Sequence, residues 1–166
     1  MEEQKSKIRG GSSMAERDII FRVGEEQYGF DVGVVTAIEP MMEIVPVPNA
    51  PACVMGLMNL RGEVIPVYSL RKRFALEEVN DPANNKLIVT HYDGKAIAFK
   101  VDEVLEMHDF EDEMISATPK IAVTSKTAYV RSVANKGGKL VLLLEPAGMY
   151  QGDEEAQMAE VLKALG

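Results

Sequence analysis

The sequence has no tryptophan, two histidines and a single cysteine, Cys53. One cysteine excludes an intramolecular disulfide framework and any multi-cysteine zinc site. No apolar run approaches the roughly 20 residues needed to cross a bilayer, and the N-terminal segment has no apolar core of signal-peptide length. We therefore expect a cytoplasmic protein that does not insert directly into a membrane.

Basic residues are also scarce. Lysine and arginine number 18 against 26 aspartates and glutamates, which gives a net charge of -8. The one basic run, Arg71 to Arg73, is too short to form the stripe that a phosphate backbone requires. Aromatic side chains suited to base stacking make up only 6% of the chain. Nucleic acid is therefore not expected as a partner.

Motifs for catalysis and cofactor binding are missing as well. The sequence contains no dinucleotide-binding fingerprint, Walker A motif or GxSxG motif. His91 and His108 have no second ligand at metal-binding spacing. A nucleophile–base pair of Cys53 with one of these histidines remains an alternative, although nothing in the sequence brings the residues together. We expect no enzymatic activity, no cofactor and no metal.

What the sequence does contain is apolar residues in alternation, which predict β-hairpins. The predicted pairs are residues 19–23 with 28–32 through Gly24–Glu26, 56–60 with 63–69 through Arg61–Gly62, 87–92 with 95–101 through Asp93–Gly94, and 130–135 with 139–144 through Lys136–Gly138. A separate strand is expected at Val34–Ile38. Pro66 cannot donate to a ladder, so its strand is expected at a sheet edge or with a bulge.

Other patterns predict the segments around these strands. Prolines in residues 46–51 favour an extended connection, followed by one helical turn at Ala52–Met55. Residues 1–16 are polar and rich in glycine and serine, which is typical of a flexible arm. An amphipathic helix is predicted over residues 153–165, from the i, i+3, i+4, i+7 spacing of Met158, Val161, Leu162 and Leu165.

The chain also repeats itself. Residues 28–38 align with residues 97–107 at an offset of 69, and residues 54–67 align with residues 130–143 at an offset of 76. By this alignment, each half contains, in order, a hairpin, a turn, a long connection, a short helix and a second hairpin. Chance similarity between two β-rich segments is the alternative explanation.

Five short strands per half can close into a small barrel, which leaves few exposed strand edges. Barrels of about 70 residues have marginal cores on their own, so the two should share a hydrophobic seam. We expect a mainly β fold in which a domain at residues 17–150 holds two interleaved barrels. The first is predicted mainly at residues 28–80 and the second mainly at residues 87–145.

Four stretches occur in a characteristic order between Asp18 and Leu144: YGFDVGVVTAI, PNAP, VMGLMNLRGEVIPVYSLRKRF and AFKVDEVLEM. Together they resemble the bacterial chemotaxis coupling family CheW, whose core pattern (V/I)xGxxNLRGxxxPxxxL is matched at residues 54–70. The resemblance implies a pair of five-stranded SH3-like barrels with short helices, no catalysis and no cofactor.

The resemblance also implies a function and two partners. Members of the family are adaptors that bridge the cytoplasmic tip of methyl-accepting chemoreceptors and the regulatory domain of the histidine kinase CheA, within membrane-bound receptor arrays. A CheW-like scaffold of a different two-component pathway is the alternative.

Two partner surfaces follow from the resemblance. Apolar residues near the junction of the barrels are expected to bind the receptor, because spaced aliphatic side chains suit a docked helix: Val32, Val35, Ile38, Val101 and Val104. Residues around the NLRG turn are expected to face the kinase: Gly56, Asn59, Arg61, Gly62 and Ile65. Arg61 would be the polar anchor, since a guanidinium forms a planar fork to a carboxylate or to carbonyls; a solvated turn charge is the alternative.

Three features depart from the family pattern. Ala37 stands where the family commonly has a glutamate, so one polar contact on the receptor side is expected to be missing. Lys136–Gly137 replaces Leu-Arg in the second half, so that half is not expected to duplicate the kinase contact. The predicted C-terminal helix lies beyond the core motif, and its partner is open.

Overall fold

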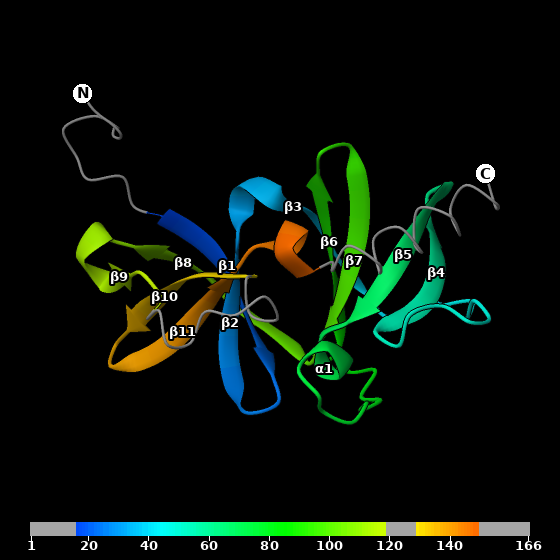
Figure 1. The fold of residues 1–166 in the computed structure, drawn as a ribbon, viewed down its shortest axis with the longest axis horizontal. Helices are drawn as coiled ribbons and strands as arrows, with labels where there is room; N and C mark the ends of the chain where they lie inside the picture. The colour runs from blue at the N-terminus through cyan, green and yellow to red at the C-terminus, as the bar shows by residue number, and fades with distance from the viewer. Residues whose placement is uncertain (1–15, 119–128, 150–166) are drawn as a thin grey trace.

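Two β-sheets lie side by side in the computed structural model, which describes residues 16–118 and 129–149 (Figure 1). The predicted helix at residues 153–165 lies outside these ranges, as does the predicted arm at residues 1–16 except for Glu16. No helix within the described ranges is long and apolar enough to cross a membrane.

The right-hand sheet in Figure 1 has five strands, and we call it barrel 1. Its strands, in spatial order, are β3 (Val35–Pro40), β6 (Lys86–Tyr92), β7 (Lys95–Val101), β5 (Glu63–Ser69) and β4 (Val54–Leu60). The left-hand sheet, barrel 2, contains β8 (Glu103–Phe110), β1 (Glu16–Val23), β2 (Glu26–Asp31), β11 (Lys139–Leu144), β10 (Val130–Lys136) and β9 (Ile115–Ser116). The helices are η1 (Val32–Val34), α1 (Leu70–Arg73), η2 (Asp112–Met114) and η4 (Pro146–Met149).

The strand order confirms the internal repeat. An offset of 69 carries β1, β2 and β3 onto β6, β7 and β8, and an offset of 76 carries β4 and β5 onto β10 and β11. The order β3-β6-β7-β5-β4 in barrel 1 then corresponds strand for strand to β8-β1-β2-β11-β10 in barrel 2. The two barrels are therefore copies of one unit, and chance similarity is not needed to explain the sequence repeat.

The predicted barrel bounds of 28–80 and 87–145 differ from the sheets. The hairpin β6–β7 belongs to barrel 1, where β7 runs parallel to β5, and the hairpin β1–β2 belongs to barrel 2, where β2 runs parallel to β11. Each barrel thus contains one hairpin from the other half of the sequence: β6–β7 in barrel 1 and β1–β2 in barrel 2. Apolar alternation identifies a strand but not its non-local partner, so the sequence could not locate this exchange.

Alternation along the strands builds three clusters of buried side chains. In β1, Ile19 and Phe21 join a cluster that lies between the barrels, whereas Ile20 points into barrel 2. In β6, Ile88 joins the same central cluster, whereas Leu87 and Val89, on either side of it in the sequence, point into barrel 1. We call the central cluster the seam. Because the seam covers the outer faces of these strands, they carry apolar residues on both sides.

Two local predictions are wrong. Ala52–Met55 is not a helix: Val54 donates a hydrogen bond to the Pro51 carbonyl (2.9 Å), which closes a single turn, and β4 begins at Val54. The strand that contains Pro66 is not at an edge, since β5 lies between β4 and β7. Pro66 is tolerated there because the pairing of β5 with β7 begins only at the next residue, Val67. The β4–β5 pairing does contain a bulge, but it lies between Val54 and Gly56 of β4 and not at Pro66 itself.

Candidate partner-binding surfaces

The β4–β5 turn is held by an asparagine. The side-chain Oδ1 of Asn59 accepts a hydrogen bond from the Gly62 N–H (2.8 Å), while Arg61 and Gly62 both have positive φ, at 51° and 90°. Such a turn matches the twist of the flanking strands. Barrel 2 repeats the arrangement, with Asn135 accepting from the Gly138 N–H (2.7 Å). Asn59 and Gly62 therefore shape the turn.

Arg61 extends from this turn into solvent. Its side chain is 72% exposed, and Nη2 lies 3.1 Å from Oε2 of Glu39, whose side chain is 15% exposed. A guanidinium carries five N–H donors, so this contact leaves capacity for an acceptor on a partner. The pair also joins the β4–β5 turn to β3. In barrel 2, Lys136 contacts Glu106 on β8, but the offsets of 76 and 69 make these residues the equivalents of Leu60 and Ala37, not of Arg61 and Glu39.

Glu39 lies close in sequence to Ala37, the position where the resemblance implies a glutamate. Ala37 is half-buried against the core of barrel 1. Glu39 lies two residues further along β3, so its side chain projects from the same face of the strand. The carboxylate that pairs with Arg61 belongs to Glu39, two residues after Ala37.

Two residues expected on the kinase side do not reach the surface. Ile65 is fully buried in the core of barrel 1. Gly56 is buried, with a φ of 149°, and a Cβ there would stand 2.2 Å from the carbonyl oxygen of Val45. Val45 and Leu57 exchange two backbone hydrogen bonds at this point, so Gly56 allows the connection from β3 to lie against β4. Both residues support the turn from within.

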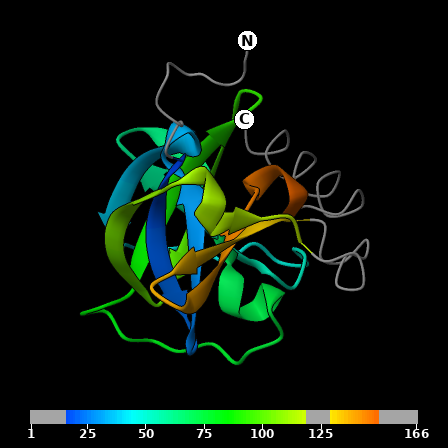
Figure 2. The same ribbon diagram turned by 90° about the vertical axis from the view of Figure 1, so that its left-hand side faces the viewer.

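The residues expected on the receptor side lie mainly along the border of the seam. Val32, Val35 and Val104 are half-buried and pack against the seam, and Ile38 is 40% exposed. Val101 differs, because it is 1% exposed inside the seam and has no surface to offer a partner. Strands β3 and β8, which carry Val35, Ile38 and Val104, lie on the same side of the molecule, at the left in Figure 2; Val32 lies in η1, just before β3.

Met107 is a border residue that sequence reasoning missed. It lies on β8, pairs with Ile19 of β1, and is 56% exposed. The offset of 69 makes it the equivalent of Ile38, so the repeat itself carried the signal. We call Val32, Val35, Ile38, Val104 and Met107 the seam rim.

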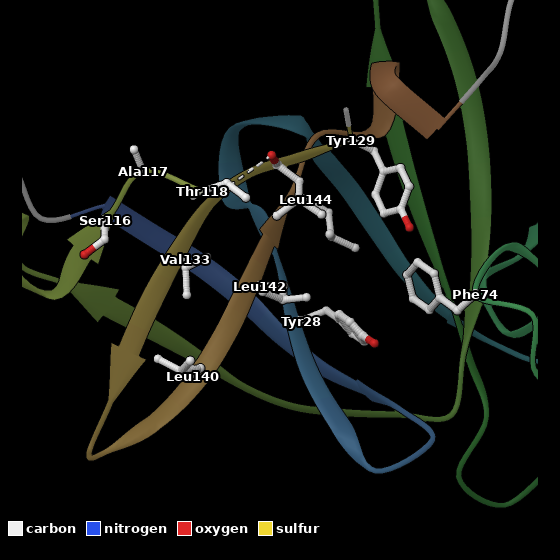
Figure 3. Close-up of a pocket in the computed structure, with 11 residues that line it drawn as sticks. Tyr28, Phe74, Ser116, Ala117, Thr118, Tyr129, Val133, Leu140, Leu142 and Leu144 are labelled. Carbon is white, nitrogen blue, oxygen red and sulfur yellow. Dashed lines mark hydrogen bonds between the residues drawn. The ribbon is translucent and has the colours of Figure 1, made fainter. Parts of the chain in front are cut away.

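An apolar cavity of about 580 Å³ opens on barrel 2 beside the seam (Figure 3). Aromatic rings form one wall: Phe74 lies 4.8 Å from Tyr28 and 5.9 Å from Tyr129, centroid to centroid. No charged residue lines the cavity among those that the structure describes. Thr118 and Tyr129, which both line it, are joined through residues 119–128, outside the described ranges. We assign this cavity no ligand.

The residues considered for catalysis have other surroundings. Cys53 is half-buried against the seam. The Nδ1 of His91 lies 3.0 Å from the hydroxyl of Thr36, and His108 packs against the ring of Phe110. In residues 16–118 and 129–149, no group of three or more histidine, cysteine, aspartate or glutamate side chains could hold a metal ion.

One buried charge cluster lies at the start of β1. Arg131 of β10 contacts Glu16 Oε2 (2.6 Å) and Asp18 Oδ1 (2.7 Å), and Asp18 is completely buried. Burial and the neighbouring Glu16 raise the pKa of Asp18 to about 8, although Arg131 opposes the shift. The cluster ties β1 to β10 inside barrel 2; Asp18 is fully buried, while the side chains of Glu16 and Arg131 are each 23% exposed.

Comparison with known proteins extends this picture. Residues 19–154 match the CheW-like domain family. The chain belongs to this family. The chemotaxis protein CheW of Klebsiella aerogenes is 28% identical over 154 residues, covering 93% of each chain. That of Thermotoga maritima is 26% identical over 125 residues, covering 75% of this chain and 81% of the relative.

A solved structure supports the same assignment. The crystal structure of the scaffolding protein TtCheW from Thermoanaerobacter tengcongensis matches with a TM-score of 0.77 and 27% identity, covering 85% of this chain and 96% of that one. The prediction of a mainly β fold built from two SH3-like barrels is thereby confirmed. The protein is a CheW-like member of a family of chemotaxis scaffolds.

Proposed function

We propose that this protein is a non-catalytic adaptor that couples the cytoplasmic tip of chemoreceptors to the regulatory domain of the histidine kinase CheA. Membership of the CheW-like family supports the proposal, since the match covers residues 19–154. In this account the protein acts by binding two neighbours at once, and receptor conformation biases kinase activity through its body.

The observation that carries the proposal is the presence of two different surfaces on one well-packed body. Arg61 projects from the outer turn of barrel 1, whereas the seam rim borders the junction of the barrels. The seam takes buried side chains from both sheets. Because a large apolar interface resists relative motion of the two halves, a displacement at one surface is carried to the other.

The surface around Arg61 suits the kinase. An exposed arginine at the centre of a contact is often one of the few residues that dominate binding energy. Glu39 restrains the guanidinium at one side, which lowers the entropy lost when a partner acceptor binds.

The seam rim suits the receptor tip. Its members are aliphatic or methionine side chains, so they bury area against an apolar helix face without requiring a fixed polar geometry. Val101 contributes from below by filling the seam under the rim.

The second candidate is a CheW-like scaffold of a different two-component pathway. The alanine at position 37, where the resemblance implies a glutamate, favours it, because a change in the charge pattern on β3 alters which partners fit the adjoining rim.

Binding measurements with purified fragments separate the two candidates. Calorimetric titration of the protein with a receptor-tip fragment and with a CheA regulatory domain should show both binding, and each should still bind in the presence of the other. If the protein binds the kinase domain but not this receptor fragment, and a receptor of another class binds in its place, the result would instead support the different pathway.

A further inference from the structure

Asp102 stands where the chain passes from barrel 1 to barrel 2, between β7 and β8. Its side chain is 6% exposed, and its carboxylate accepts hydrogen bonds from both barrels. Arg71 of α1 donates from Nε to Oδ1 (2.8 Å) and from Nη2 to Oδ2 (2.6 Å). From barrel 2, the Gly24 N–H in the β1–β2 turn donates to Oδ2 (2.8 Å).

The backbone of Asp102 is held as well. Its N–H donates to the carbonyl of Arg22 (3.0 Å), and its own carbonyl accepts from Nδ2 of Asn85 (3.1 Å). A bidentate arginine–carboxylate contact is both strong and geometrically specific. Together these bonds fix Asp102 relative to three separate segments of the chain.

The charge of the Asp102 carboxylate is consistent with these hydrogen bonds. Burial on its own would raise the pKa of Asp102, but the Arg71 guanidinium and the Gly24 N–H together hold it below the usual carboxyl value. Asp102 is therefore ionised at neutral pH, and both carboxylate oxygens act as acceptors.

The equivalent crossing from β2 to β3 lacks this device. The offset of 69 places Gly33, which has no side chain, at the position of Asp102. There Asp31 accepts a hydrogen bond from the Gly33 N–H (2.7 Å), a contact within one turn. The start of β3 is thus held locally at this point, whereas the start of β8 is held by contacts with both barrels.

We propose that Asp102 is a positioning residue for receptor binding: by fixing the start of β8 it sets Val104 and Met107 against the β3 side of the seam rim. Val104 follows two residues after Asp102, and Met107 follows five residues after it. The inference rests on the proposed function, because the seam rim is where the receptor tip is proposed to bind.

The test compares Asp102→Asn with Glu103→Gln in the full chain. Glu103 is the next residue, half-exposed, and its carboxylate lies 3.4 Å from Arg22, so its variant controls for the loss of one local charge. Asp102→Asn should weaken binding of a receptor-tip fragment about tenfold, the loss expected when the burial of about one apolar side chain is forfeited. Binding of the kinase regulatory domain should remain unchanged, as should both affinities of Glu103→Gln.

Methyl NMR supplies a readout that does not depend on either partner. Asp102→Asn should shift the methyl resonances of Val104 and Met107 and leave those of Val67, in the core of barrel 1, in place. If Asp102→Asn does not fold, Arg71→Lys, which removes the bidentate contact, serves in its place.

Three results would overturn the inference: unchanged receptor affinity, equal losses for both partners, or unmoved rim methyls. If the unaltered protein binds no receptor fragment, the proposed function fails. The methyl shifts then still decide whether Asp102 positions β8.

Discussion

At the scale of single residues, the NLRG turn (residues 59–62) contains residues that stabilise the turn and one side chain, that of Arg61, that projects into solvent. Asn59 and Gly62 close the turn, and the buried Ile65 anchors the strand behind it. Arg61 alone extends outward, where its contact with Glu39 is an exposed ion pair. Such pairs contribute at most about 1 kcal/mol to stability, so Arg61 is available for binding at little cost to the fold.

Replacing Arg61 with alanine should therefore weaken kinase binding without unfolding the protein. We expect at least a tenfold loss of affinity, roughly the effect of truncating an interfacial arginine, and a change in unfolding free energy below about 1 kcal/mol. Calorimetric titration and thermal melts measure the two effects. Lys139→Ala, an exposed cation at the equivalent hairpin of barrel 2, is the matched control. Parallel losses of stability and affinity in Arg61→Ala would show that Arg61 acts only through the fold.

Gly56→Ala should destabilise the protein strongly. The added Cβ would meet the Val45 carbonyl oxygen at 2.2 Å, in a backbone conformation that side chains rarely adopt. We expect a loss of about 2 kcal/mol or more in chemical denaturation. Gly62→Ala is the comparison, because Gly62 also has positive φ but has no heavy atom within 4 Å of the added Cβ; it should cost about 1 kcal/mol. Equal costs for the two variants would mean that the connection to β4 moves aside.

These residues show what the sequence can and cannot predict at this scale. The turn at Arg61–Gly62 was predictable because glycine in a short hairpin connection has a local meaning. The burial of Ile65 and Val101 was not, because it depends on which face of the strand packs inward in three dimensions. Glu39 was also missed, since its contact with Arg61 spans 22 residues of sequence.

At the scale of elements, β3 and β8 are equivalent strands of the two repeats, and both border the seam. Each carries a half-buried valine, Val35 or Val104, and an exposed apolar residue at the equivalent position, Ile38 or Met107; β8 also exposes Leu105. The proposed receptor surface is thus built twice by the same sequence pattern. Both copies contribute to one rim.

Val35→Asp should impair receptor docking, because it places a charge where an apolar helix is proposed to bind. Val35 also packs against the seam, so some loss of stability is expected, and Ile38→Asp at a more exposed position separates the two effects. Each variant should weaken receptor-fragment binding at least tenfold in a titration. Val79→Asp, an exposed apolar position outside the rim, should have no effect. Intact folds with full receptor affinity in both rim variants would exclude β3 from the docking surface.

Elements were predicted better than their assembly. Four hairpins were placed correctly because alternation and turn residues lie close together in sequence. The exchange of the β1–β2 and β6–β7 hairpins was not predicted, since parallel pairings such as β5 with β7 leave no local trace. Residues 70–73 were not predicted to be helical, although Ser69 caps this helix by accepting from the Lys72 N–H (3.1 Å).

At the scale of the whole molecule, two buried carboxylates give opposite pH dependence. Asp102 has a lowered pKa, so its contribution to stability is present at neutral pH and is lost as the pH falls through the acid range. Asp18 has a pKa raised from 3.8 to about 8. Its contribution is fully present below about pH 4 and is lost as the pH rises through 8.

Asp18→Asn should therefore flatten the alkaline side of the stability profile. In the unaltered protein, the native state holds a proton on Asp18 that the unfolded chain has released, so unfolding free energy should fall by up to about 1.4 kcal/mol per pH unit between pH 6 and 8. Asparagine keeps a carbonyl acceptor for Arg131 and has no proton to lose. Denaturation at several pH values measures the slope, and identical slopes in the two proteins would show that Asp18 is ionised in the fold.

The protein is proposed to bind receptor and kinase at once and to transmit control between them. Reconstitution of the kinase with receptor fragments, with and without this protein, tests this proposal most directly through the rate of kinase autophosphorylation. We expect receptors to change the rate only when the protein is present, and Arg61→Ala to reduce this effect. Receptor control that is equal with and without the protein, or that never appears, would contradict the proposal.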